Sequence, residues 1–242
     1  MKIVFETGGK KGSSFDVTNS STLTSGRGMF SEANITSFSH DLSALTKGKY
    51  MFYKSYLNSF TSKLPNLTEG SYMFYDCTAL KTFTSDLSSL TNCKYMFYNC
   101  DKLTDFDAKM SALTNGEGMF SKCPSLTTFY SDLSSLTNGN YMFGDCDKLK
   151  SFYSDSSGSP VNLSALTNGN YMFYNCTSLT SFESDLSKVT DGRYMFYNCT
   201  SLSEFKDTND SIDKNMFDLS LLENGYAMFY NCINYKGSYH KG

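Results

Sequence analysis

The sequence has little of what histidine-based catalysis, nucleic-acid binding and membrane insertion require. It holds only two histidines, His40 and His240, and no nucleophile motif stands near His40. The 21 Lys and Arg against 24 Asp and Glu give a formal net charge of -3. Such a weak charge creates no field that would gather nucleic acid. No apolar run approaches the roughly 20 residues that span a bilayer. We therefore expect no enzyme, no nucleic-acid partner and no membrane insertion.

Two further signals are missing near the N-terminus. The stretch MKIVFETGGKKGSSF lacks the apolar segment of a secretory signal, so signal-directed export is not expected. Its GGKKGSS portion does not meet the G-x-x-x-x-G-K-[ST] spacing of a phosphate loop, and a solvated turn explains it better. The sequence thus predicts no cofactor.

What the sequence has in abundance is one repeated segment. Met-Phe pairs recur along the chain with steps of 22, 22, 23, 23, 23, 30, 23 and 33 residues. A fixed period in the low twenties lies in the range of leucine-rich repeats and predicts a solenoid, in which each unit buries its apolar side only by stacking on neighbours. The pairs begin at Met29, Met51, Met73, Met96, Met119, Met142, Met172, Met195 and Met228.

The repeating unit is roughly D-L-S-x-L-T-N-G-x-Y-M-F-Y-N-C-x-x-L-x-x-F-x-S. Apolar residues recur at every third position, which fits neither a long amphipathic helix nor a long alternating strand. We expect a flattened coil with a short helical turn at YMFYNC, a short parallel strand around LTSF and a turn through SDLSSLTNG. The predicted fold is a leucine-rich-repeat solenoid of about nine coils of 22–23 residues.

Domain organisation follows from where the repeat begins, breaks and ends. Residues 1–23 predict a capping hairpin around a glycine-rich turn, residues 24–236 the solenoid, and residues 237–242 a C-terminal tail. The two long steps come from insertions at 153–161 and 206–217, both between the strand phenylalanine and the next D-L-S segment. Such loops are candidate contact sites. They are explained equally well as surface insertions that the fold tolerates without any contact role.

Units carrying M-F-x-x-C-x-x-L-x-x-F linked by D-L-S-x-L-T-N resemble the leucine-rich repeats of BspA-like bacterial surface proteins, over about residues 24 to 236. The resemblance implies extracellular binding, by adhesion to host proteins or to other cells. The missing export signal keeps a second location open, because a virion component needs no signal peptide. The sequence therefore leaves the localisation undecided.

Seven cysteines occupy the same repeat position, and stacking would place neighbours about 4.8 Å apart. That distance permits disulfides, but Ala33 and Ser55 fill the same slot in the first two units, which favours free thiols in a core. Zinc is less favoured, since no C-x-x-C motif or histidine cluster accompanies them. Cys93 stands where eight other units have glycine, so we expect close packing there and an ordinary negative φ. The column comprises Cys77, Cys100, Cys123, Cys146, Cys176, Cys199 and Cys232.

Strand residues that flank the inward phenylalanine should point outward. Most are small hydroxyl residues, but acids and two tyrosines occur in the middle units. A solvated strand face would look much the same. The sharper hypothesis is a binding patch in which aromatic planes beside carboxylates hold a glycan or a protein loop. The candidate residues are Asp105, Asp107, Tyr130, Tyr153 and Glu183.

Tyrosines before and after the Met-Phe pair form a second exposed set. Two units read GMFS and lack both tyrosines together, so we expect each pair to pack on itself or on the pair of the next coil. Such stacking joins coil to coil, or it provides an aromatic flank for assembly.

Two functions remain on the sequence alone. The first is a non-enzymatic scaffold that binds or adheres to a protein or glycan ligand through its sheet face and inserted loops. The alternative is a structural part of a larger assembly, such as a phage virion decoration, a tail fibre or a self-stacking filament, whose partners are copies of itself or other virion proteins.

Overall fold

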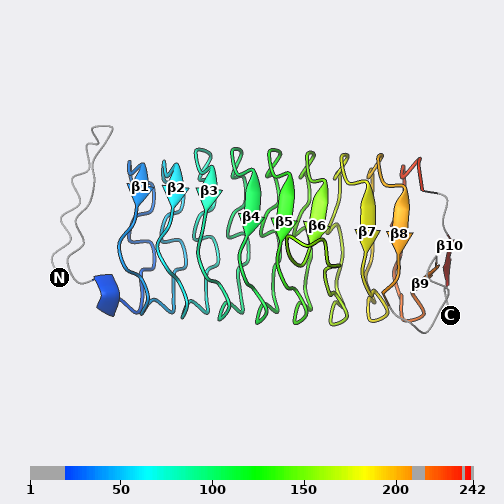
Figure 1. Cartoon of the computed structure of the whole chain (residues 1–242), viewed down its shortest axis with the longest axis horizontal. Coiled ribbons are helices and arrows are strands. Elements are labelled where there is room, and N and C mark those ends of the chain that lie inside the picture. Colours follow the sequence, from blue (N-terminus) through cyan, green and yellow to red (C-terminus); the bar gives the residue numbers. More distant parts are fainter. Residues whose placement is uncertain (1–19, 209–215, 236–237, 241–242) are drawn as a thin grey trace.

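Stacked coils form an elongated rod with short strands along one face (Figure 1). The computed structural model describes residues 20–208, 216–235 and 238–240. The strands expected for the capping hairpin fall within residues 1–19 and lie outside this part of the chain. The fold class expected from the sequence, a leucine-rich-repeat solenoid with parallel strands, is confirmed.

Eight of the strands formed by the described residues come from successive repeats and pair in parallel, in the groups β1-β2-β3, β4-β5-β6 and β7-β8. Their phenylalanines are in register, so that Phe106 lies opposite Phe129, and Phe129 opposite Phe152. The strands are β1 (Ser37–Phe38), β2 (Ser59–Phe60), β3 (Thr82–Phe83), β4 (Asp105–Asp107), β5 (Thr128–Tyr130), β6 (Ser151–Tyr153), β7 (Ser181–Glu183), β8 (Glu204–Lys206), β9 (Met216–Asp218) and β10 (Ser238–His240).

The row of strands from β1 to β8 is shorter than the nine coils expected from the Met-Phe pairs. From β1 to β8 the described residues complete about seven turns. The ninth pair begins at Met228, and the strand that follows it, β10, pairs with β9 at the C-terminal end. The last coil continues the stack at its turn, where Asn224 pairs with Asp191, but it adds no strand to the row from β1 to β8. Counting Met-Phe pairs therefore gives more turns than the row of strands does.

The segment YMFYNC forms turns but no helix, so the expected helical turn is wrong. Within the described residues the only helix is a single 3-10 turn, η1 (Ser20–Thr22). In the fifth coil Gly116, Gly118, Phe120 and Lys122 donate backbone hydrogen bonds to carbonyls of the following coil at 2.8 to 2.9 Å. An α-helix would direct these N–H groups to its own carbonyls four residues back. Pairing between coils therefore replaces helix formation.

Each of these turns also places two residues in the left-handed backbone region. Tyr141 has a φ of 55° and Asp145 a φ of 62°, and most coils repeat this pattern. The conformation costs an L-residue about 1–2 kcal/mol. Glycine occupies the first position in two coils, at Gly28 and Gly118. Where tyrosine stands there instead, its contacts must offset the cost.

The repeated glycine of the T-N-G turn is required by close packing. A Cβ added at Gly139 would lie 2.9 Å from Sδ of Met172 in the next coil. Cys93 takes this position in one coil, and its Sγ lies 3.1 Å from Sδ of Met119. Cys93 is not among the residues with positive φ. The expectations of close packing and an ordinary φ at Cys93 are confirmed.

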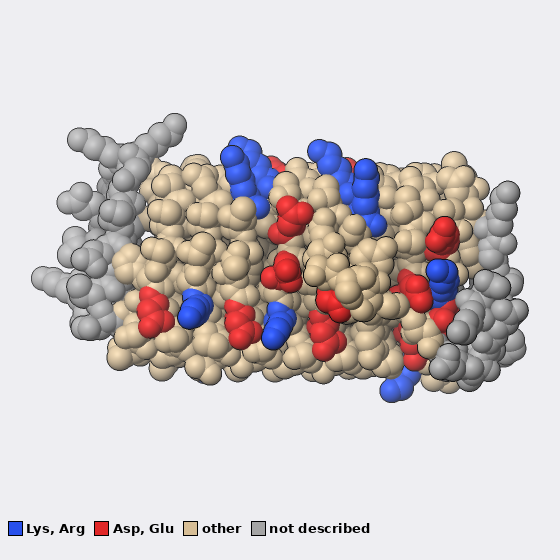
Figure 2. Space-filling view, viewed as in Figure 1, with Lys and Arg blue, Asp and Glu red and all other residues tan. Residues whose placement is uncertain are grey.

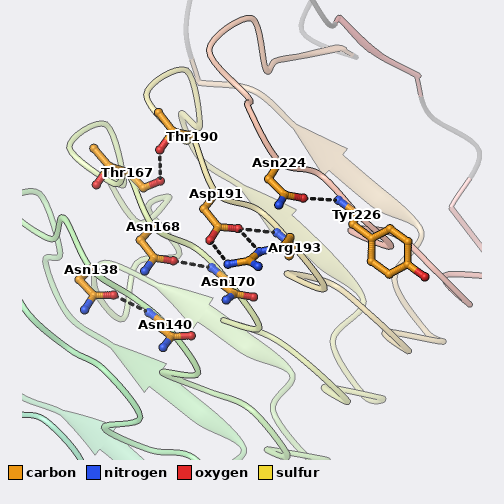
Figure 3. A network of polar contacts seen from close by, with 10 residues as sticks. All are labelled: Asn138, Asn140, Thr167, Asn168, Asn170, Thr190, Asp191, Arg193, Asn224 and Tyr226. Atoms are coloured by element: carbon orange, nitrogen blue, oxygen red, sulfur yellow. Dashed lines mark hydrogen bonds and ion pairs between the residues drawn. The ribbon is translucent and has the colours of Figure 1, made fainter.

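Threonine side chains join successive T-N-G turns, and asparagine side chains hold each turn internally (Figure 3). The hydroxyl of Thr190 donates to the carbonyl of Thr167 in the preceding coil at 3.3 Å. Oδ1 of Asn168 accepts a hydrogen bond from the backbone N–H of Asn170 at 3.0 Å. Asp191 replaces the asparagine in the next coil and accepts from the N–H two residues on in the same way. The bonds to Asn168 and Asp191 satisfy backbone N–H groups of the turn, whereas the Thr190 hydroxyl adds to the two backbone hydrogen bonds that the Thr167 carbonyl already accepts.

Two columns of phenylalanine fill the core. Phe120 of a Met-Phe pair stacks on Phe97 and Phe143 of the adjacent coils, with ring centroids 5.4 and 5.5 Å apart. It meets Phe106 of the strand column edge-on at 4.7 Å. All four rings are buried. A single coil has no neighbour for either face of these rings and could not bury them alone.

Replacing Phe106 with alanine should lower the free energy of unfolding by about 3–5 kcal/mol. The ring is fully buried and contacts Phe83, Phe97, Phe120 and Phe129. Denaturant unfolding followed by circular dichroism measures the loss. Thr128→Ala, on the outer side of the adjacent strand, should change the stability by only about 0.5 kcal/mol. Equal losses in the two variants would contradict the packing described here.

Candidate functional site

The candidate strand residues meet on one surface of the rod. Asp107 lies opposite Tyr130 in the register of β4 and β5, and Tyr130 lies opposite Tyr153 in the register of β5 and β6. Asp105 and Asp107 are exposed, and the two tyrosines are half-buried. Side chains alternate along a strand, so these residues point outward while the phenylalanine between them points into the core. We call Asp105, Asp107, Tyr130 and Tyr153 the sheet-face patch.

The carboxyl groups of the sheet-face patch are exposed to solvent. Asp105 accepts hydrogen bonds from the hydroxyls of Thr104 at 2.8 Å and Thr127 at 3.5 Å. Across the described residues neither Asp105 nor Asp107 forms an ion pair. Figure 2 shows acidic side chains near the middle of this face, and acidic and basic side chains alternating along its lower edge. The outer surface of the patch therefore carries two carboxyl groups without a basic partner among the described residues.

The insertion loop 153–161 borders the patch. Asp155 in this loop accepts hydrogen bonds from the hydroxyl and the backbone N–H of Ser157. These bonds, led by the hydroxyl, hold the pKa of Asp155 below its usual value. Gly158 has a φ of 83°, a conformation that favours glycine. The loop thus presents an ionised carboxylate beside the strands.

A hollow of about 360 Å³ opens between the patch and the loop. Asp107, Tyr130, Asp132 and Asp155 line it, together with Lys109. Asp132 and Asp155 lie outside the strands, so a pattern read only from strand positions misses them. The sequence signal for residues beyond the strands was the insertion itself, which begins at Tyr153.

Glu183 lies beside a second, smaller hollow of about 180 Å³, which it shares with Tyr153 and Gly158. Its carboxylate is 4.0 Å from Nζ of Lys206 on β8. Glu183 therefore has a basic partner within ion-pair distance, unlike Asp105 and Asp107 among the described residues. Tyr153 is the one residue of the sheet-face patch that lines this hollow together with Glu183.

The second insertion, 206–217, falls partly outside the described residues, which omit 209–215. At its described edges Oδ2 of Asp207 accepts a hydrogen bond from the backbone N–H of Asp218 at 2.9 Å. Asp207 is buried. A contact role for this loop stays a prediction.

The seven column cysteines lie in the core as free thiols. Each Sγ hydrogen-bonds to a phenylalanine carbonyl of the preceding coil; for Cys123 the acceptor is Phe97, at 3.1 Å. In the coil before Cys77, Ser55 fills the cysteine slot, and its hydroxyl contacts Sγ of Cys77 at 3.5 Å. Burial raises the pKa of Cys77 to about 11 and that of Cys123 to about 12. The column is built of protonated thiols that join coils, and such thiols are poor nucleophiles.

The tyrosines stack from coil to coil, as the pattern predicts. Tyr50 and Tyr72 have ring centroids 4.9 Å apart, and Tyr53 meets Tyr50 edge-on at 5.7 Å. We call the two rows the tyrosine columns. The first contains Tyr50, Tyr72, Tyr95, Tyr141, Tyr171 and Tyr194, and the second Tyr53, Tyr75, Tyr98, Tyr174, Tyr197 and Tyr230.

Neither a metal centre nor a membrane segment is found in the part of the chain that the structure describes. No group of three or more His, Cys, Asp and Glu side chains there could hold a metal ion. No helix there has the length and apolar character needed to cross a bilayer.

A rod of parallel coils, held by buried aromatic columns and side-chain ladders, defines a leucine-rich-repeat scaffold. The chain belongs to the family described as the BspA type leucine rich repeat region. The family model matches in 6 copies, over residues 11–92, 46–168 and 139–236. A search of curated proteins gave no match.

Several solved structures are similar to this chain. A leucine rich cell surface protein from Faecalibacterium prausnitzii is 18% identical, with a TM-score of 0.43, and the match covers 74% of this chain and 59% of that protein. A leucine-rich repeat protein from Bacteroides ovatus is 16% identical, with a TM-score of 0.38 and coverage of 88% and 69%. One from Eubacterium ventriosum is 16% identical, with a TM-score of 0.37 and coverage of 74% and 56%. This chain thus spans less than two thirds of the length of the Faecalibacterium protein.

The buried thiols predict a loss of stability at high pH. Their pKa is raised on folding from 9.0 to about 11 or 12 for Cys77 and Cys123, so unfolded thiols ionise first. The stabilisation is present below pH 9 and disappears as the pH rises through these folded values, with a slope of up to about 1.4 kcal/mol per pH unit for each thiol. Denaturant unfolding between pH 8 and pH 11 measures it. Cys123→Ser should show a shallower decline, and a parallel decline would contradict the assignment.

Proposed function

We propose that this chain is a non-enzymatic binding scaffold that holds a protein ligand with basic side chains on its sheet-face patch. The observation that carries the proposal is the placement of Asp107, Tyr130 and Tyr153 side by side on three neighbouring strands, next to a hollow walled by the insertion loop. Leucine-rich-repeat families generally serve binding or adhesion, and membership of the BspA type family supports that class of function.

Charge and aromatic surface together select the ligand. Asp132 and Asp155 add two carboxylates to Asp107 around the first hollow, against one amine from Lys109. An arginine side chain can pair with a carboxylate and lie over a tyrosine ring at the same time. A peptide segment that presents arginine or lysine therefore fits this surface better than an acidic one.

An array of synthetic peptides that differ in arginine, lysine and glutamate content tests the proposal. The wild-type chain should bind arginine-containing peptides, and the double variant Tyr130→Ala/Tyr153→Ala should bind them at least about tenfold more weakly. Rising salt should weaken wild-type binding, because the contacts are partly electrostatic. The matched control is Ser59→Ala/Thr82→Ala, on the same face but on β2 and β3, and it should bind like wild type. Equal binding by both double variants would refute the proposal.

One observation favours a second function, assembly through the C-terminal end. The last coil exposes large apolar side chains, with Leu221 55% and Ile233 70% accessible. Tyr226 and Tyr230 beside them are 68% and 62% accessible. Such an apolar surface suits contact with another copy of the chain.

Light scattering of the untagged chain across a concentration series tests this second function. Assembly predicts a mass above 27.1 kDa that grows with concentration. Leu221→Glu/Ile233→Glu should return the mass to that of one chain, because it places charge in the contact. A constant mass of one chain for the wild type would eliminate assembly and leave the binding scaffold.

A further inference from the structure

We propose that a gap in the tyrosine columns is a binding site for a neutral oligosaccharide. In the fifth coil Gly118 and Ser121 stand where most coils have the two tyrosines, and in the sixth coil Gly144 replaces the second tyrosine. The tyrosine columns belong to the turns, whereas the sheet-face patch belongs to the strands. This proposal is therefore independent of the proposed function.

Stacked rings end on both sides of the gap. On one side Tyr98 stacks on Tyr75 at 4.7 Å, and on the other Tyr141 stacks on Tyr171 at 4.4 Å. Ser121 lies between them and is buried. The missing side chains leave a hollow of about 400 Å³ with tyrosine walls. This volume is within the range of about 300–1,000 Å³ that small-molecule sites occupy.

Tyr95 is another of the residues that line the hollow. A Cβ added at Gly118 would lie 2.2 Å from Cε1 of Tyr95, so the ring of Tyr95 leans over the position of the missing side chain. The same ring meets Tyr98 at 78° with centroids 5.6 Å apart. Tyr95 and Tyr98 together present two differently oriented aromatic faces to anything that enters.

Two groups of opposite charge complete the lining. Nζ of Lys122 lies 5.5 Å from the ring centroid of Tyr98, and a hydrogen bond with the Tyr98 hydroxyl raises the pKa of this lysine. Asp145 accepts a hydrogen bond from Nδ2 of Asn175 at 2.8 Å, which fixes its carboxylate at the rim. The hollow therefore offers a donor and an acceptor but no net charge.

These features select a sugar ring over other ligands. A pyranose has an apolar C–H face that can lie on tyrosine, and hydroxyls that both donate and accept hydrogen bonds. A cation in the hollow would be repelled by Lys122, and an anion would be repelled by Asp145. A wholly apolar ligand would remove water from both charges without replacing their hydrogen bonds. A neutral hexose chain meets all these conditions.

The chain provides a matched pair of variants for the test. Ser121→Tyr restores the tyrosine that most coils carry at this position, and its ring would stack on Tyr98 and occupy the hollow. Ser31→Tyr makes the same substitution in the other GMFS segment, at the first coil, far along the rod from the gap. Both variants follow the repeat, so both should fold, which circular dichroism checks.

Binding of cellohexaose, maltohexaose, mannohexaose and chitohexaose is measured by titration calorimetry and by tyrosine fluorescence, which is unobscured because the chain has 0 Trp. At least one of the four should bind the wild type with a Kd of about 1 mM or tighter, a usual strength for a small open site. Ser121→Tyr should weaken that binding at least about tenfold, and Ser31→Tyr should leave it unchanged. Tyr141→Ala should weaken it as well, by removing one wall.

Three results would overturn the proposal. The first is that none of the four hexaoses binds the wild type. The second is that Ser121→Tyr binds them as well as the wild type does. In the third, Tyr130→Ala/Tyr153→Ala abolishes oligosaccharide binding while Ser121→Tyr retains it, which would place the sugar on the sheet-face patch. Failure of peptide binding in the patch variant leaves the oligosaccharide result unaffected, so the two proposals are tested separately.

Discussion

Contact between successive coils is the constraint on which the rest of this structure depends. In the turns, alternate backbone N–H groups donate to the following coil, as Gly116 and Phe120 do to Asn138 and Met142. In the core, each phenylalanine ring is covered by the rings of its neighbours. Neither these hydrogen bonds nor the face-to-face stacking of the rings exists within one coil, so the same residues must recur in register. The repeated sequence is the direct result of this requirement.

The period and the inward residues could be predicted from the sequence because each is set by one repeated position. Phenylalanine, leucine and cysteine mark the core. Cys93, which replaces the recurrent glycine in one coil, shows that the glycine is required by close packing. The helical turn could not be excluded in advance, because local spacing does not show that N–H groups are used by the next coil. The left-handed conformation at Tyr141 could not be predicted either, because glycine is the residue that normally marks this conformation in a sequence.

The candidate site was predicted only in part, for a similar reason. Alternation along a strand is enough to place Asp107, Tyr130 and Tyr153 on one face. Asp132 and Asp155 come from the turn and the insertion loop, and their approach depends on how those segments fold over the strands. The gap at Gly118 and Ser121 was visible as a departure from the repeat, but its tyrosine walls and its volume required the three-dimensional structure.

Departures from the repeat therefore define the two proposed sites. A regular coil presents nearly the same surface as its neighbours, so it gives no unique site. The insertion loop adds an acidic wall at one place, and the missing tyrosines open an aromatic hollow at another. In both cases the regular coils on either side supply a rigid frame, which lowers the cost of ordering a site before a ligand arrives.

Native-state amide hydrogen exchange, resolved by residue with NMR, tests most directly whether coil-to-coil pairing holds the rod together. The account predicts that the N–H groups of Gly116, Gly118, Phe120 and Lys122 exchange only through global unfolding, since all four are bonded to the next coil. Exposed N–H groups of the insertion loop should exchange much faster. Rapid exchange of the four central amides in the folded chain would contradict the account.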